Sequence, residues 1–326
     1  MNYRKFGNTD LSVSEIGFGA WGIGGPAMVG DIAIGWGNVN DENSIKALKR
    51  SFELGINFYD TADFYGFGHS EELIGKVFGN RDDVVIASKV GHRVENDTIV
   101  LDYTKKHILK SCDDSLKRLQ RNHIDYYQLH SAKLEHLQNG ECIDAMEQLK
   151  RTGKIRYWGI SLNTFNPYPE AELLINKNLA DGFQLVLNII NQRSLKLIKS
   201  AEVKGYGVIA RIPLQFGLLT GKFNKNTKFE KNDHRYFRLP PEFLAELIDT
   251  LVSVWTLTDK YGISKTSLAL SFILNHSGVS TVIPGIKTPE QAELNTQQLI
   301  KIDPQDMNLL HILFEEKFDK LVGKML

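Results

Sequence analysis

Residues 56–66, INFYDTADFYG, contain the pattern on which the fold depends: a short apolar run ends on a carboxylate, Asp60, and Tyr65 follows five residues later. Eight such β-rich runs precede longer amphipathic segments, at residues 14–20, 56–60, 83–89, 125–130, 156–161, 182–187, 205–211 and 280–284. This alternation predicts parallel strands joined by helical crossovers. Because no linker or long-period repeat interrupts it, we expect residues 1–326 to form one domain, an α/β fold of the (β/α)8 TIM-barrel type.

Two segments lie outside this alternation. Residues 3–6 and 11–13 flank a polar turn, Gly7-Asn8-Thr9-Asp10, which predicts an N-terminal β-hairpin that caps the bottom of the barrel. The longest gap, between the seventh and eighth strands, contains the Lys- and Asn-rich tract 222–232, which we expect to be a surface loop and a lid. Helices are predicted after it, from Pro241 and over residues 265–275.

Composition excludes several classes of protein. Lysine plus arginine number 39 and aspartate plus glutamate also number 39, so nothing favours a nucleic acid or an anionic membrane as partner. Cys112 and Cys142 lack metal-ligand spacing, and the start of the chain lacks a signal-peptide core. We therefore expect a soluble cytoplasmic protein with a small-molecule partner, and no implied protein partner. No metal site is expected, because the histidines are scattered: His69, His92, His107, His123 and His136.

A glycine-rich stretch, Gly17-Phe18-Gly19-Ala20-Trp21-Gly22, satisfies the G-x-G-x-x-G pattern of a dinucleotide-binding Rossmann unit. A working fingerprint must open a helix, yet further glycines and Pro26 follow here. We therefore interpret the stretch as a glycine-rich strand end that lines a pocket, with Trp21 and Trp36 as substrate-pocket residues.

Polar residues gather where the second to fourth predicted strands end: Asp60, then Tyr65, Lys89 and His130. Each alone has a structural explanation, such as helix capping, ring packing or a hydrogen bond to backbone. Together they indicate a site, because neighbouring barrel strands converge at their carboxyl ends.

These residue types suit one kind of chemistry. A tyrosine is an easy proton donor and acceptor near neutral pH only when an ammonium such as Lys89 stabilises its phenolate. A buried ammonium in turn needs an anion, here Asp60. With His130 orienting a carbonyl oxygen, Tyr65 can protonate the alkoxide that forms when hydride adds to an aldehyde or ketone. The hydride must come from a cofactor.

With these residues the chain resembles the aldo-keto reductases over nearly its whole length, from YRKFGNTDLSVS at residues 3–14 to DTADFYG at residues 60–66. The resemblance implies a (β/α)8 barrel that reduces carbonyls with NADPH. It also implies that Asp60, Tyr65, Lys89 and His130 are the catalytic tetrad.

The resemblance also implies cofactor-binding positions. Ser161 and Gln184 match residues that hold the nicotinamide carboxamide, whereas the family's Asn after that Ser is Leu162 here, with Asn163 one place later. Arg211 stands where many members have an aromatic that stacks on the nicotinamide, and a guanidinium plane can also stack. The segment that wraps the pyrophosphate is matched by Pro213, Leu214, Gly217, Leu219 and Lys222.

The adenosine-phosphate segment is matched by residues 283–291 and Asn295, with Gly285 within it. Lys287 and Thr288 supply donors suited to a 2'-phosphate, which favours NADPH/NADP+ over NADH. Gln291 and Asn295, four apart on a helix, would face the adenine. A solvated strand-to-helix turn is the alternative for this segment.

Three functions remain open on the sequence. The first is NADPH-dependent reduction of an aldehyde or ketone to an alcohol, and the second is an NADPH-binding regulatory subunit with little turnover, because a fold and a bound cofactor do not prove catalysis. The third is a Schiff-base lyase that uses Lys89. The sequence does not identify the carbonyl substrate, the physiological direction or the oligomeric state.

Overall fold

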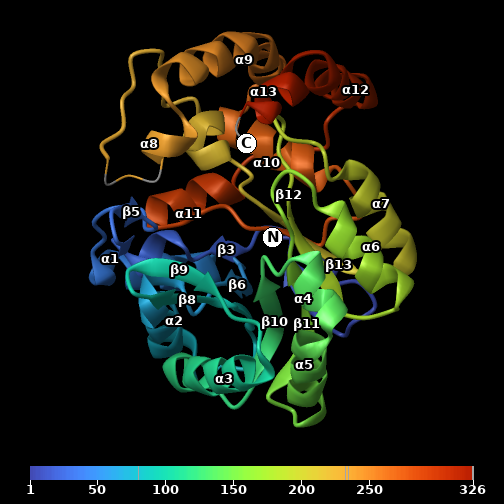
Figure 1. Cartoon of the computed structure of the whole chain (residues 1–326). Coiled ribbons are helices and arrows are strands. Elements are labelled where there is room, and N and C mark those ends of the chain that lie inside the picture. The colour runs from blue at the N-terminus through green and yellow to red at the C-terminus, as the bar shows by residue number, and fades with distance from the viewer. Residues whose placement is uncertain (80, 232, 234, 325–326) are drawn as a thin grey trace.

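The computed structural model describes residues 1–79, 81–231, 233 and 235–324. Eight parallel strands form one sheet in the order β14-β13-β12-β11-β10-β7-β6-β3. Figure 1 shows helices arranged around these central strands. Bridges between Ile16 and Val282 and between Gly19 and Gly285 join the two edges of the sheet. The predicted (β/α)8 barrel is therefore confirmed. Its strands are β3 (Phe18–Gly19), β6 (Phe58–Asp60), β7 (Val85–Val90), β10 (Ile124–His130), β11 (Ile155–Ser161), β12 (Gly182–Val186), β13 (Gly207–Arg211) and β14 (Thr281–Val282).

Helices cover the outside of this barrel because their apolar faces pack on the strands. Those following the first six barrel strands are α1 (Asp41–Glu53), α2 (His69–Phe78), α3 (Lys105–Leu119), α4 (Leu134–Asn139), α5 (Glu141–Arg151), α6 (Tyr168–Asn176) and α7 (Leu195–Lys204). The later ones are α8 (Arg235–Arg238), α9 (Pro241–Tyr261), α10 (Lys265–Leu274), α11 (Pro289–Thr296), α12 (Pro304–Leu313) and α13 (Asp319–Gly323), with a π-helical turn, η4 (Phe314–Phe318), before α13. No helix of the described residues is both long and apolar enough to cross a membrane.

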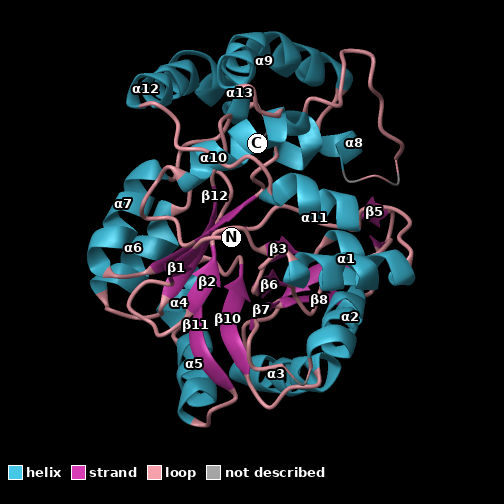
Figure 2. Ribbon diagram, turned by 180° about the vertical axis from the view of Figure 1, so that it is seen from behind, coloured by secondary structure: helices cyan, strands magenta, loops and turns pink. Residues whose placement is uncertain are grey.

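The predicted N-terminal hairpin is confirmed as β1 (Tyr3–Lys5) paired with β2 (Ser12–Ser14), and it lies against the barrel strands in Figure 2. Phe6, in its turn, is buried with its ring centroid 4.8 Å from that of Tyr126 and 6.4 Å from that of Phe58. A Cβ at Gly207 would lie 2.4 Å from this ring, so only glycine leaves room for it. The hairpin thus closes the end of the barrel where the strands begin.

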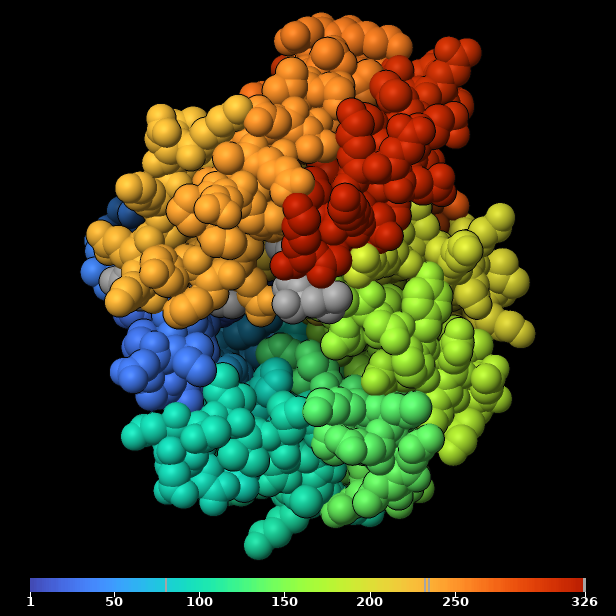
Figure 3. Space-filling model, turned by 45° about the horizontal axis from the view of Figure 1, so that its top comes forward, coloured from blue at the N-terminus to red at the C-terminus, as the bar shows by residue number. Residues whose placement is uncertain are grey.

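Short irregular elements surround the opposite, carboxyl end of the strands. They are the hairpins β4 (Met28–Val29) with β5 (Ile32–Ala33) and β8 (His92–Glu95) with β9 (Thr98–Leu101), and the 3-10 turns η1 (Gly22–Gly24), η2 (Tyr65–Gly68) and η3 (Gln215–Thr220). The tract 222–231 is an irregular loop, as predicted, while residue 232 lies outside the described residues. Figure 3 shows a central hollow bordered by blue, cyan, green and orange segments.

Candidate active site

Lys89 is the centre of a polar cluster at the carboxyl ends of the second to fourth barrel strands. Its Nζ donates to Asp60 Oδ2 at 2.6 Å and to the Thr61 carbonyl at 2.7 Å, and it lies 3.2 Å from the Tyr65 hydroxyl. The lysine and aspartate side chains are 0% and 3% exposed. The structure therefore brings together three of the four residues that the strand ends indicated.

The electrostatics of this cluster keep the lysine charged and the tyrosine protonated. Burial lowers the pKa of Lys89, but the attraction of Asp60 and then Tyr65 outweighs it and leaves the pKa raised. Burial raises the pKa of Tyr65, and Lys89 opposes this only in part. The expected lowering of the tyrosine pKa is thus present as the Lys89 contribution, while burial dominates in the resting site.

Two glutamines hold the second oxygen of Asp60. Gln184 Nε2 donates to Asp60 Oδ1 at 2.7 Å, and Gln128 Nε2 donates to the same atom at 3.1 Å. Gln184, expected at the nicotinamide carboxamide, therefore has its amide nitrogen bound to the aspartate, while its Oε1 lies 3.5 Å from Ser161 Oγ. Gln128 was not expected at this site from the sequence, although a residue two positions before His130 on one strand shares its face.

His130 completes the cluster at the end of β10, and a second imidazole accompanies it. The ring centroid of His130 lies 5.9 Å from that of Tyr65 and 4.3 Å from that of His92. Burial, then His92 and Lys89, hold the pKa of His130 well below its usual range. Burial and Lys89 lower the pKa of His92 to about 4. Both rings are therefore neutral near pH 7. Although His92 was grouped with scattered histidines on the sequence, its ring lies beside that of His130.

Arg211, at the end of β13, also faces this cluster. Its Nη2 donates to the Leu162 carbonyl at 2.9 Å and to Thr164 Oγ1 at 3.2 Å, and its buried Nε has no hydrogen-bond partner among the described residues. Burial lowers the pKa of the guanidinium, while Tyr65 and Asp60 oppose the shift. The fixed plane of Arg211 is thus available to a ligand lying over the cluster.

Asn163, in contrast, is not brought to the cluster. Its side chain is exposed, and its Oδ1 accepts from the backbone N–H groups of Phe165 at 2.8 Å and Asn166 at 3.0 Å. An asparagine that closes an Asx turn in this way uses its acceptor locally. The structure therefore gives Asn163 a role in loop geometry.

Aromatic rings form one side of the cluster. The ring of Trp21 is stacked 6.0 Å from that of Tyr65, and Trp36 meets Trp21 edge-on at 5.1 Å. Trp21 Nε1 donates to the Ile34 carbonyl at 2.9 Å, which fixes the indole plane. Of the two tryptophans expected at the pocket, Trp21 therefore lies beside the tyrosine, and Trp36 lies against Trp21.

The glycine-rich stretch ends in η1, a single 3-10 turn, and not in the helix that a Rossmann site requires. A Cβ at Gly22 would lie 2.7 Å from Lys287 Cγ, so the glycine lets this lysine cross the strand ends. The interpretation as a glycine-rich pocket wall therefore fits the structure.

A group of cations suited to phosphates lies beyond this wall. Burial, followed by repulsion from Arg235, lowers the pKa values of both Lys222 and Lys287. Neither lysine has an ion pair among the described residues. The 3-10 turn η3 lies just before Lys222 and contains Gly217, with φ of 93°, and Leu219. Pro213 and Leu214 lie just before this turn.

The start of α11 offers further donors. Thr288 caps the helix by accepting from the Gln291 N–H at 3.4 Å, and Gln291 Oε1 accepts from the Lys287 N–H at 2.7 Å. The buried Nδ2 of Asn295 has no partner among the described residues. A Cβ at Gly285 would meet nothing within 4 Å. Lys287 Nζ has one long hydrogen bond, 3.5 Å to the Trp36 carbonyl. The open space at Gly285, the amide donor of Asn295 and two lysines without a carboxylate partner among the described residues fit an adenine dinucleotide phosphate.

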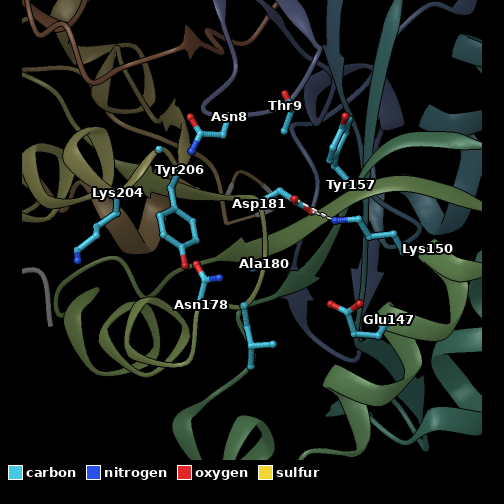
Figure 4. A pocket seen from close by; sticks show the side chains of 12 residues that line it. Asn8, Thr9, Glu147, Lys150, Tyr157, Asn178, Ala180, Asp181, Lys204 and Tyr206 are labelled. Atoms are coloured by element: carbon cyan, nitrogen blue, oxygen red, sulfur yellow. Dashed lines mark hydrogen bonds and ion pairs between the residues drawn. The ribbon is translucent and has the colours of Figure 1, made fainter.

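No group of three metal-ligating side chains occurs within the described ranges. A separate cavity of about 270 Å³ lies at the hairpin end of the barrel, between Asn8, Tyr157 and Tyr206 (Figure 4). Its Lys150 and Asp181 pair with each other at 2.9 Å. This cavity lies at the end of the barrel opposite the tetrad, and Lys150 and Asp181 in its lining satisfy each other.

Known proteins resemble this chain in both sequence and fold. The sequence profile of the Aldo/keto reductase family matches residues 15–315. The aldo-keto reductase YhdN of Bacillus subtilis (strain 168) is 29% identical over 331 residues, which cover 95% of this chain and 93% of that protein. An aldo-keto reductase of Bacillus halodurans in its holo form superposes with a TM-score of 0.75 at 27% identity, covering 96% of each chain.

One relative is named for another activity. A putative voltage-gated potassium channel subunit beta of Schizosaccharomyces pombe is 28% identical over 349 residues, covering 98% of this chain and 93% of that protein. The family is one of oxidoreductases that act on small carbonyl compounds and typically depend on NAD(P)H.

Proposed function

The chain belongs to the aldo/keto reductase family, and we propose that it reduces an aldehyde or ketone reversibly to an alcohol with NADPH, using Tyr65 as general acid. The observation that supports this most is the buried lysine whose Nζ lies 2.6 Å from Asp60 Oδ2 and 3.2 Å from the Tyr65 hydroxyl. A buried cation beside a phenol stabilises the phenolate that remains after proton donation.

Each residue of the tetrad has one task in this proposal. NADPH, when bound, supplies the hydride that adds to the carbonyl carbon. Neutral His130 donates a hydrogen bond to the carbonyl oxygen and orients it. Tyr65 then gives its proton to the developing alkoxide, and Lys89 stabilises the phenolate. Asp60 balances the lysine charge, and the two amides on its other oxygen hold it in place.

The cofactor would lie across the strand ends from Arg211 to α11. Lys222 and Lys287 would meet phosphate oxygens, with Thr288 contributing a hydroxyl and Asn295 its unpaired amide. Charge-assisted hydrogen bonds to a 2'-phosphate favour NADPH over NADH. Ser161 and the Oε1 atom of Gln184 are the groups left for the carboxamide end.

The two other candidate functions have less support. Lys89 is fully buried, paired with Asp60 and has a raised pKa, which disfavours the neutral amine that a Schiff base requires. A regulatory subunit shares the fold with the potassium-channel relative, yet the complete tetrad with its supporting glutamines is the arrangement that turnover needs. We also propose a reducing, cytoplasmic location, in keeping with the free, buried Cys112 and Cys142.

The test is the decay of NADPH absorbance with an aryl aldehyde, for the wild type and for Tyr65→Phe, repeated with NADH. We expect turnover with NADPH well above that with NADH, and a variant that binds NADPH without turning over. A wild type that binds NADPH tightly but reduces no aldehyde or ketone would instead identify a regulatory subunit.

A further inference from the structure

His92 is held beside the tetrad by an unusual turn of the chain. Gly91, directly after β7, has φ of 130°, and a Cβ there would lie 2.1 Å from the Tyr103 ring. The hydroxyl of Tyr103 donates to the His130 carbonyl. One tyrosine therefore packs on the turn that precedes His92 and also contacts the backbone of His130, so it positions the backbone at both histidines.

The two imidazoles form a pair with free hydrogen-bonding atoms. Their centroids are 4.3 Å apart, and the ring of Phe64 lies 5.3 Å from that of His92 on another side. The Nδ1 atoms of both histidines are buried and have no hydrogen-bond partner among the described residues. Each side chain is half-buried, and neither ring makes a hydrogen bond within the part of the chain that the structure describes. Partly buried polar groups left in this state beside a reacting site have a ligand as their natural partner.

Resting on the proposed function, we propose that His92 binds a hydroxyl group on the carbon next to the reacting carbonyl, so that α-hydroxy aldehydes and ketones are the preferred substrates. His130 holds the carbonyl oxygen in that reaction, and its neighbour His92 reaches the oxygen on the adjacent carbon. His92 is then a residue that determines specificity, and it takes no part in the proton transfer from Tyr65 to the alkoxide.

The charge state of the pair favours a hydroxyl as the group bound. Burial, with a smaller contribution from Lys89, lowers the pKa values of both histidines, so both are neutral at pH 7. A neutral imidazole has one donor and one acceptor nitrogen, and a hydroxyl can match either. A carboxylate or phosphate at the same position would meet an uncharged ring, and an ammonium would be repelled by Lys89.

The test compares hydroxyacetaldehyde with acetaldehyde in the wild type, His92→Phe and His92→Gln. We expect His92→Phe to lower kcat/KM for hydroxyacetaldehyde about tenfold, the usual effect of one hydrogen bond to a neutral group, and to change that for acetaldehyde less than about twofold. The Gln variant, which keeps a donor and an acceptor, should recover most of the loss. Hydration of each aldehyde cancels because the same solutions serve all variants.

Equal losses with both aldehydes would overturn the proposal, since His92 would then act only by supporting His130. Unchanged kinetics in the Phe variant would overturn it as well. A readout without turnover separates it from the proposed function: the ¹⁵N signals of labelled histidine in the NADP+ complex, with His92 assigned from His92→Gln. Hydroxyacetone should shift the His92 signal and acetone should not. A shift of the His92 signal with hydroxyacetone alone would support the role of His92 even if the protein reduces no carbonyl. The absence of a shift with hydroxyacetone would overturn it.

Discussion

At the end of the barrel that the hairpin closes, Asp125 accepts from Arg156 at 2.9 Å and Lys150 pairs with Asp181 at the same distance. At the open end, neither Lys222 nor Lys287 has an ion pair within the described ranges. Burial and neighbouring cations lower the pKa values of both lysines there. These charges of the closed end are thus paired within the protein, whereas Lys222 and Lys287 at the open end have no carboxylate partner among the described residues and are available to an anionic ligand.

The charges at the closed end stabilise the fold, whereas the two lysines at the open end are available to a ligand. Paired charges and packed rings stabilise the fold, while unpaired cations and imidazoles cost free energy in the free protein and recover it on binding. Lys89 is the exception, because it is at the open end and fully paired. Its partner Tyr65 must nevertheless change charge during the proposed reaction, so this pair belongs to the chemistry and not to the scaffold.

The largest expected effect is the loss of activity in Tyr65→Phe. Removal of a general acid lowers kcat by roughly 10²–10⁴-fold, while the melting temperature stays nearly constant because only one long contact to Lys89 is lost. Tyr126→Phe is the matched control, since the Tyr126 hydroxyl is buried toward the closed end and has no hydrogen-bond partner in the part of the chain that the structure describes. Steady-state kinetics and thermal unfolding measure both. A comparable loss of kcat in the control would show that the two ends are not independent.

The second effect is on stability alone. Phe6→Ala removes a ring that packs against Tyr126 and Phe58 in the closed end. We expect the free energy of unfolding to fall by about 3–5 kcal/mol, because the cavity beside Gly207 cannot refill easily. Urea unfolding measures the loss, and kcat of the folded fraction should be unchanged. A large fall in kcat would mean that packing at the closed end sets the geometry of the tetrad.

The sequence predicted the fold well, because alternation of short apolar runs with amphipathic segments is a property of every repeat of the barrel. The convergence of the strand ends also led us to expect that Asp60, Lys89 and His130 lie close together, whereas their catalytic roles stay a prediction. His92 was missed because the turn at Gly91, with φ of 130°, sends the chain back toward the tetrad, and no local pattern reveals its direction. Asn163 was expected at the cofactor because the sequence does not show that its carbonyl would close a turn.

The pKa of Tyr65 could be predicted from the sequence only in part. The neighbouring ammonium was foreseen, but the size of the opposing burial effect depends on how deeply the site is enclosed, which is a tertiary property. Gln128 was detectable in principle, from its two-residue spacing to His130, but many strand residues share that spacing with a site residue.

The third prediction concerns the unpaired charges of the open end. Lys287→Met should weaken NADPH binding about tenfold, the effect of losing one charge-assisted hydrogen bond, and change NADH binding less than about twofold. The free protein should become no less stable, because repulsion from Arg235 is relieved. Fluorescence titration measures both affinities. Lys150→Met is the control: it breaks the pair with Asp181 and should lower stability without changing either affinity, and equal weakening of both cofactors by Lys287→Met would contradict the phosphate assignment.

The smallest expected effect compares two histidines, one at each end. His92 lies beside the tetrad and His276 beside the hairpin, where its carbonyl accepts from Arg4, and burial is the first cause that lowers each pKa to about 4. Unfolding restores a value near 6.5, so between pH 6.5 and 4 the unfolded chain binds more protons, and stability falls as the pH is lowered.

Replacing either residue by glutamine should therefore lessen the acid-induced fall in melting temperature, by roughly 2 °C each. The melting temperatures of the wild type, His92→Gln and His276→Gln between pH 4 and 7.5 test this. Parallel curves for all three would contradict the burial argument. A smaller gain for His92→Gln alone would show that solvent at the open end already relaxes its desolvation, which would confine the cost of burial to the closed end and make the contrast between the ends sharper.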